Sequence, residues 1–169
     1  MKKDLGIIFG LFLLIIVLLI FGRGFTTGVF LRPSATSGGQ LQPTKGVVTI
    51  TAKGLTIEVQ VAQKPSERKV GLSKKDSLPL NAGMLFVFEE PGKYGIWMKD
   101  MKFAIDIIWI NEEKKIVDIA SNVAPEPGKK DKELTIYRPQ AAAKYILEIN
   151  AGLARLNNIQ IGDQVNFEL

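Results

Sequence analysis

The chain has 169 residues, which is enough for one ordinary domain and accessory segments. It contains neither cysteine nor histidine, which excludes disulfides, thiol nucleophiles, Ser-His-Asp triads and imidazole-bound metals. Its formal net charge of +5 is partly N-terminal and otherwise dispersed, so it does not favour nucleic acid binding. Catalysis would need carboxylates, Lys, Tyr, Ser or Thr, or a bound cofactor, and no motif predicts a cofactor.

An uninterrupted apolar segment follows the basic N-terminus, residues 1–4, which contains Lys2 and Lys3. Residues 5–22 carry no charged or strongly polar side chain. At about 1.5 Å per residue, such a helix spans roughly 27 Å, close to the hydrocarbon thickness of a bilayer. Arg23 and Phe25 extend it into the interface, and we predict a transmembrane signal-anchor over residues 5–25.

A cleaved signal peptide and a buried core helix are the alternatives for this segment. The apolar run exceeds the usual h-region of ~7–15 residues, and Arg23 interrupts any small-x-small cleavage site. A helix that is apolar on every face would need protein all round it, which a chain of this size cannot supply. Although the flanking charges are nearly balanced, an uncleaved signal predicts a cytoplasmic N-terminus and an extracytoplasmic domain on a single-pass cell-membrane protein.

Residues 26–46 are rich in Gly, Pro, Ser and Thr and predict a flexible linker. The domain, residues 47–169, begins with two alternating segments across Gly54, residues 47–53 and 55–61, which predict a hairpin. Pro65 and Gly71 then bracket one or two helical turns.

The rest of the domain is read as short strands and turns. Strands are predicted at residues 84–88, 94–98, 105–111, 116–120, 134–137 and 145–149, followed by a short helix within 151–158 and an alternating strand near the C-terminus. About eight short strands with few helices indicate a mainly β fold, either a small antiparallel sandwich or a partly closed barrel with one or two short helices. An α+β domain is the alternative.

An ordered set of motifs extends through this domain. It comprises Glu67-Arg68-x-x-Gly71-Leu72, Ala82-Gly83-Met84-Leu85-Phe86, Trp97-Met98-Lys99-Asp100-Met101, Ile105-Asp106-Ile107-Ile108, Leu147-Glu148-x-x-Ala151-Gly152 and Ile161-Gly162-Asp163. In this order the motifs resemble the DUF192 family of prokaryotic proteins over roughly residues 47–169. The sequence differs at Asp100 and Met101, where the family more often has Asn and Thr. The resemblance implies a compact β-rich fold, often behind a signal or anchor, and no established reaction.

Two carboxylates lie in otherwise apolar strands. Asp106 is flanked by Ile105, Ile107 and Ile108, so an unpaired charge on it would be costly, and Glu148, in a similar apolar segment, is a second possible member of an ionic cluster. The Arg68 guanidinium can bind a carboxylate through two hydrogen bonds and is the predicted partner. One interpretation is therefore a buried ionic cluster that binds no ligand.

The functional interpretation places Trp97, Lys99, Asp106 and Glu148 around one concave site, with Arg68 as a further ligand-binding candidate. Trp97 would provide an apolar platform while the charged groups orient a polar small molecule or a glycan. Such a domain would be a non-catalytic binding or interaction module, expected to be monomeric.

Two other chemistries are open. Asp106 and Glu148 could act as the general acid and base of a carboxylate-dependent hydrolase acting on glycans. Met84, Met98 and Met101 could bind Cu(I) through their thioethers, although methionines are more often core residues.

The densest basic segment, residues 128–132, is interpreted as a solvated loop, with contact to anionic headgroups as the alternative.

Overall fold

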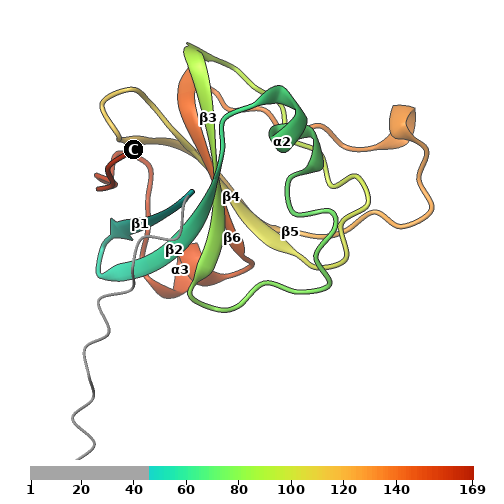
Figure 1. The fold of residues 1–169 in the computed structure, drawn as a ribbon, viewed down its shortest axis with the longest axis horizontal. Helices are drawn as coiled ribbons and strands as arrows, with labels where there is room; N and C mark the ends of the chain where they lie inside the picture. Colours follow the sequence, from blue (N-terminus) through green and yellow to red (C-terminus); the bar gives the residue numbers. More distant parts are fainter. Residues whose placement is uncertain (1–45) are drawn as a thin grey trace, which may run out of the picture. The chain divides into compact units, whose positions relative to one another are not determined.

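The computed structural model describes residues 46–169, which form one six-stranded mixed β-sheet with short helices at its periphery (Figure 1). The elements are β1 (Val47–Ala52), β2 (Leu55–Ala62), α2 (Pro65–Val70), β3 (Ala82–Gly92), β4 (Ile105–Ile110), β5 (Ile116–Val123), a 3-10 turn η1 (Asp131–Glu133), β6 (Ala143–Asn150) and α3 (Leu153–Leu156). The mainly β prediction and the predicted short helices are confirmed.

The predicted anchor over residues 5–25 lies outside the described residues, as does the linker up to residue 45. Between residues 46 and 169, no helix is long and apolar enough to cross a membrane.

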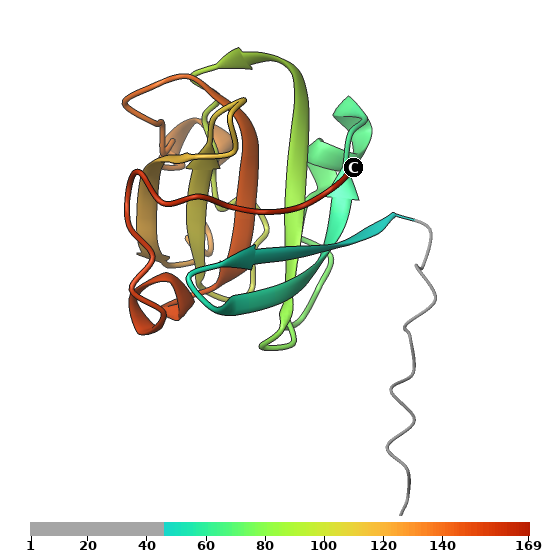
Figure 2. The same cartoon turned by 90° about the vertical axis from the view of Figure 1, so that its left-hand side faces the viewer.

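The strand order is β1-β2-β3-β6-β4-β5, and the sheet is neither purely antiparallel nor closed. Strands β2 and β3 are parallel, because the chain crosses over through α2 and a turn-rich loop before it re-enters the sheet. The other neighbouring strands are antiparallel. The predicted antiparallel arrangement is therefore wrong for β2 and β3, and one curved sheet replaces the two packed sheets of a sandwich (Figure 2).

The C-terminal segment lies between the two edges of the sheet. Asn166 exchanges backbone hydrogen bonds with Thr51 of β1, at 3.0 and 2.9 Å. Gln164 forms an isolated bridge with Lys115, next to β5. These single bridges replace the alternating strand predicted at the C-terminus.

Two further predicted strands are shorter than expected. Residues 94–98 and 134–137 form a backbone pair only at Ile96 and Tyr137, which exchange hydrogen bonds of 2.9 and 2.8 Å. The composition of both segments suits a strand, but only one residue of each segment pairs with the other segment. They form a loop layer over one face of the sheet instead.

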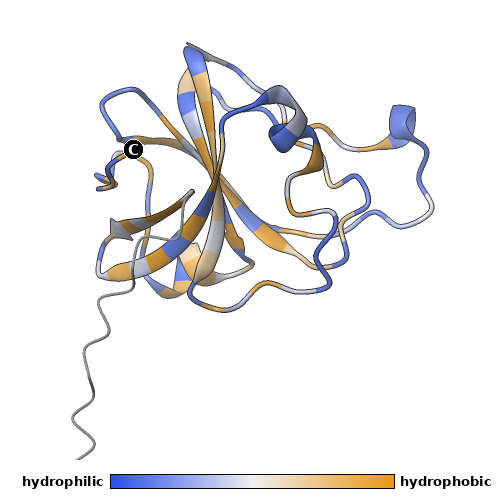
Figure 3. Ribbon diagram, in the orientation of Figure 1, coloured by the Kyte–Doolittle hydropathy of each residue, from blue (hydrophilic) through white to orange (hydrophobic). Residues whose placement is uncertain are grey.

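The sheet buries apolar side chains on both faces. Its strands contain many hydrophobic residues, coloured orange in Figure 3. All six residues of β4 are buried, and they alternate between the faces. Ile108 and Ile110 join the first core, which also contains Ile149 and Ala154. Ile105, Ile107 and Trp109 join the second core, under α2 and the loops.

Candidate functional site

The two buried carboxylates lie on opposite faces of the sheet. In the antiparallel pairing of β4 with β6, Asp106 is opposite Ile149 and Ile107 is opposite Glu148. Directly opposed residues share a face, and neighbours along a strand alternate. Asp106 therefore faces the first core and Glu148 the second. The fold does not bring them together as an acid and base pair.

Asp106 is fully buried and holds two backbone elements in place. Its Oδ1 accepts a 2.7 Å hydrogen bond from the Asn122 N–H, and its Oδ2 accepts a 2.9 Å bond from the Ala154 N–H in α3. Asn122 belongs to a bulge where two residues of β5 lie opposite Asp106, and its φ is +54°. The role of Asp106 is thus structural, and the structure does not place it in an open site.

Arg68 contacts neither carboxylate, so the predicted ionic cluster is wrong. Its Nη1 donates hydrogen bonds to the carbonyl oxygens of Gln63 and Val87, the latter at 3.0 Å. Its guanidinium carbon also lies 4.7 Å from the centroid of the Phe88 ring. Through these partners Arg68 connects the start of α2 to β3. The sequence did not indicate this connection, because every residue has a backbone carbonyl group and its type does not show which carbonyl accepts a hydrogen bond.

Residues of α2 form one wall of a pocket. Local hydrogen bonds fix the residue at which this helix begins. Pro65 occupies the first turn, and the Glu67 carboxylate accepts 3.0 Å hydrogen bonds from the N–H groups of Lys64 and Gln63. These two hydrogen bonds lower the pKa of Glu67, and the bond from Lys64 has the larger effect. At the C-terminal end, Gly71 has φ +50°, and a Cβ there would lie 3.4 Å from the Phe86 ring.

Glu148 is one of the buried residues that line this pocket, whose buried part we call the inner end, and the pocket has a volume of about 400 Å³. Its side chain is 5% exposed, and burial raises its pKa to about 8. Among the described residues, no donor forms a hydrogen bond with the Glu148 carboxyl group. Every described side-chain nitrogen or oxygen atom that is fully buried does have a hydrogen-bond partner. The carboxyl oxygens of Glu148 therefore remain in contact with the space of the pocket.

The wall around Glu148 is apolar and partly aromatic. Other residues that line the pocket include Leu72, Phe86, Phe88, Ile96, Met98, Met101 and Ile105. Sequence reasoning missed the two phenylalanines and Leu72 as site residues. The period of a strand places Phe86 on the same face as Met84, but only the observed register, with Met84 opposite Glu148, shows that this face belongs to the pocket. A backbone contact fixes this register, because a Cβ on Gly83 would lie 2.7 Å from the Glu148 carbonyl oxygen.

Trp97 and Lys99 also line the pocket, at its more exposed side, which forms the mouth. Trp97 is 47% exposed, which is high for so large an apolar side chain. Lys99 forms an ion pair with Asp131, whose hydrogen bond raises the pKa of Lys99. Arg68 and Lys69 also line the pocket. The structure thus places Arg68, Trp97, Lys99 and Glu148 around one pocket and excludes Asp106 from it.

The three methionines share the second core. Met98 and Met101 line the pocket with Glu148, whereas Met84 lines a neighbouring surface hollow beside α2. Met98 is fully buried and Met84 nearly so, as expected for core residues.

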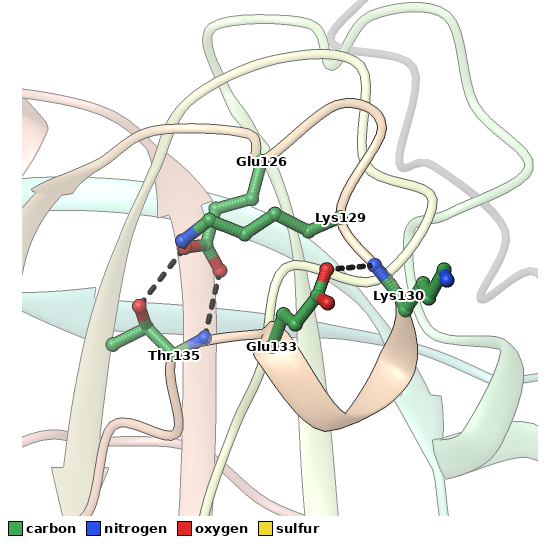
Figure 4. Close-up of polar contacts among 5 residues, drawn as sticks. All are labelled: Glu126, Lys129, Lys130, Glu133 and Thr135. Atoms are coloured by element: carbon green, nitrogen blue, oxygen red, sulfur yellow. Dashed lines mark hydrogen bonds and ion pairs between the residues drawn. The ribbon is translucent and has the colours of Figure 1, made fainter.

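The basic loop is held by its own acidic residues (Figure 4). Glu126 accepts 2.9 Å hydrogen bonds from both the N–H and the hydroxyl of Thr135, and it pairs with Lys129. Glu133 accepts a 3.1 Å bond from the Lys130 N–H. The loop is therefore a structured turn whose lysines are partly compensated.

Comparisons with known proteins agree with the motif pattern. The sequence profile of DUF192, described as "Uncharacterized ACR, COG1430", matches residues 47–167. A UPF0127 protein of Thermococcus kodakarensis is 30% identical over 90 residues, or 52% of each chain. A UPF0127 protein of Pyrococcus abyssi is 33% identical over 64 residues, covering 38% of this chain and 47% of the relative. The chain spans about half the length of the curated relatives it matches.

Two crystal structures share the fold. A protein of unknown function from Novosphingobium aromaticivorans has a TM-score of 0.63 and 28% identity, over 71% of this chain and 83% of that one. A protein of Sinorhizobium meliloti, named as a candidate transcription regulator, has a TM-score of 0.62 and 29% identity, over 72% of this chain and 92% of that one. Neither comparison supplies a reaction or a ligand.

Proposed function

The chain belongs to the DUF192 family, and we propose that its domain is a non-catalytic module that binds a small polar molecule or a glycan in the Glu148 pocket. The observation that supports this most is one buried carboxyl group without a protein partner, at the inner end of a pocket of about 400 Å³. Ligand sites in proteins are typically concave and mostly apolar, with a few polar groups that fix orientation.

The pocket has parts suited to this role. Trp97 offers an exposed ring at the mouth, on which the apolar face of a sugar or another flat molecule can stack. Lys69 adds a solvent-exposed positive charge there, Lys99 is paired with Asp131, and Glu148 supplies the polar contact inside. Arg68 acts as support for the wall, since its guanidinium already binds two carbonyl oxygens.

The alternatives have weaker support. A glycan hydrolase needs a second carboxylate near the first, and Glu148 is the single carboxylate among the described residues that line this pocket. A Cu(I) site would have only Met98 and Met101 as thioether ligands in the pocket, because Met84 lines a different hollow.

Ligand-induced stabilisation of the full chain in detergent tests the binding proposal. A set of sugars, amino acids, amines and organic acids would be screened for a rise in melting temperature. A true ligand should bind the Trp97→Ala variant at least tenfold more weakly than the wild type. It should bind the control variant Leu80→Ala as tightly as the wild type, because this truncation removes an apolar side chain that is 77% exposed and lies outside the pocket. The proposal would be contradicted if no class of compound raised the melting temperature, or if a ligand bound Trp97→Ala as tightly as the wild type.

We propose further that residues 5–25 anchor this module in the cell membrane, with the N-terminus in the cytoplasm and the domain outside. The support is the uninterrupted apolar run after Lys2 and Lys3. Protease added to intact spheroplasts should remove the domain and leave a short membrane-bound stub. Full protection of the domain, with cleavage only after lysis, would place it in the cytoplasm.

A further inference from the structure

We infer that the group which reaches Glu148 is the ammonium of an amine ligand, carried on an apolar or aromatic body. This inference rests on the proposed binding function and names the ligand class of the same pocket. It follows from three features: the unpartnered carboxyl group, the aromatic wall and the way the cations at the mouth are already engaged.

The first feature is the hydrogen-bonding capacity that Glu148 leaves unused. A carboxylate can accept several hydrogen bonds, yet no described donor contacts this one. An ammonium supplies both a compensating charge and up to three donors in one small group. In a pocket this apolar, a charged hydrogen bond is stronger than a neutral one, so an amine gains more there than a hydroxyl group does.

The second feature is the composition of the wall. Phe86 lines the pocket and Trp97 stands at its mouth, whereas Phe88 is already covered by the stacked Tyr94 ring, 3.7 Å between centroids, and by the Arg68 guanidinium. Aromatic faces attract cations, most strongly where water is excluded. Leu72, Met98 and Ile105 add apolar surface that suits the body of the ligand, and the Ser73 hydroxyl, which also lines the pocket, already donates a hydrogen bond to the Val70 carbonyl oxygen.

The third feature is the state of the positive charges that face the pocket. From α2 these are Arg68 and Lys69, and from the loop before β4 the charge is Lys99. Arg68 is bound to two carbonyl oxygens and lies over Phe88, and Lys99 is paired with Asp131. Lys69 is exposed to solvent, where salt screens its charge within about 8 Å at physiological ionic strength. Glu148 is therefore the dominant charge-bearing group at the inner end.

Proton linkage gives the inference a directional signature. An aliphatic ammonium stays charged between pH 6 and 8, whereas Glu148 must lose its proton to pair with it. Amine binding should therefore strengthen as the pH rises through this range and should release a proton. A ligand that instead accepts a hydrogen bond from neutral Glu148 should bind more weakly as the pH rises.

Two probes with the same phenyl body test this: phenethylamine, a cation, and 3-phenylpropionate, an anion. Neither absorbs at 295 nm, so tryptophan fluorescence of the full chain in detergent can follow their binding. We expect phenethylamine to bind at least tenfold more tightly at pH 8 than at pH 6, and better than 3-phenylpropionate at pH 8. Calorimetry at pH 6.5, in two buffers of different ionisation enthalpy, should count about one proton released.

Glu148→Gln keeps the shape of the side chain and removes its charge, so it should lose both the pH dependence and at least tenfold of the amine affinity at pH 8. Glu113→Gln, at an exposed position outside the pocket, should bind like the wild type. If the anion binds more tightly, or if amine affinity falls with pH, the amine inference is wrong while the binding function stands. If neither probe binds by fluorescence or calorimetry, the amine inference is wrong, and the ligand screen decides separately whether the binding function stands.

Discussion

Glu148→Gln should make the domain more stable, and increasingly so as the pH rises. Burial raises the pKa of Glu148 from 4.5 in the unfolded chain to about 8 in the folded domain. Between these values the folded state holds a proton that the unfolded state has released. The free energy of unfolding of the wild type therefore falls as the pH rises towards 8, whereas a glutamine at this position does not titrate.

The size of the effect follows from the width of this pH window. Each pKa unit corresponds to about 1.4 kcal/mol, so the stability gap between Glu148→Gln and the wild type should widen by about 3–4 kcal/mol from pH 5 to pH 8. This is a large fraction of the ~5–15 kcal/mol that stabilises a typical domain. All other titrating groups are common to both proteins and cancel in the difference.

Urea unfolding at pH 5, 6.5 and 8, followed by tryptophan fluorescence, would measure the gap. Glu113→Gln is the matched control, since it removes an exposed carboxylate, and its gap to the wild type should stay within about 0.5 kcal/mol. A gap for Glu148→Gln that stays constant from pH 5 to pH 8 would refute the reasoning. It would mean that Glu148 ionises in the folded domain like an exposed carboxyl group.

Three further predictions concern the structure. Asp106→Ala should destabilise the domain by about 2–6 kcal/mol in urea unfolding, because it leaves two backbone N–H groups without their acceptor at roughly 1–3 kcal/mol each; a loss below 1 kcal/mol would show that the bulge and α3 do not depend on it. Arg68→Lys should lower the free energy of unfolding by about 1–2 kcal/mol, since an ammonium cannot reproduce the planar contact over Phe88. Lys74→Ala, at an exposed site, is the control, and an Arg68→Lys variant as stable as this control would contradict the prediction. Deletion of residues 1–25 should yield a soluble, monomeric β domain by circular dichroism and size exclusion, whereas an insoluble product without β signal would show that the anchor belongs to the fold.

Several features of the domain follow from local patterns in the sequence. The alternation in residues 55–61 predicts a half-buried strand, and β2 covers it. The apolar run around Asp106 predicts a strand buried on both faces, as β4 is. Pro65 and Gly71 bracket α2 as predicted, because proline suits the first turn of a helix and glycine its end. In each case the information lies within one element.

The candidate site depended on relations between elements, which the sequence does not contain. Asp106 and Glu148 occupy similar apolar strands and look equivalent there, yet one closes a bulge and the other faces a pocket. A strand's period of two determines which of its own residues share a face, but not how its register aligns with a neighbouring strand. Here the pairing puts Ile107, and not Asp106, opposite Glu148.

The partners of Arg68 show the same limit. The sequence indicates which side chains carry opposite charge, and on that basis it predicted a carboxylate partner. In the folded chain the guanidinium lies nearer to the carbonyl oxygens of Gln63 and Val87, and these backbone groups are present at every residue whatever its type. Residue types thus determined the strands, the helix and the set of polar residues available for a site. Only the tertiary structure decided which of those residues share a pocket, because register and chain crossing set the distances between them.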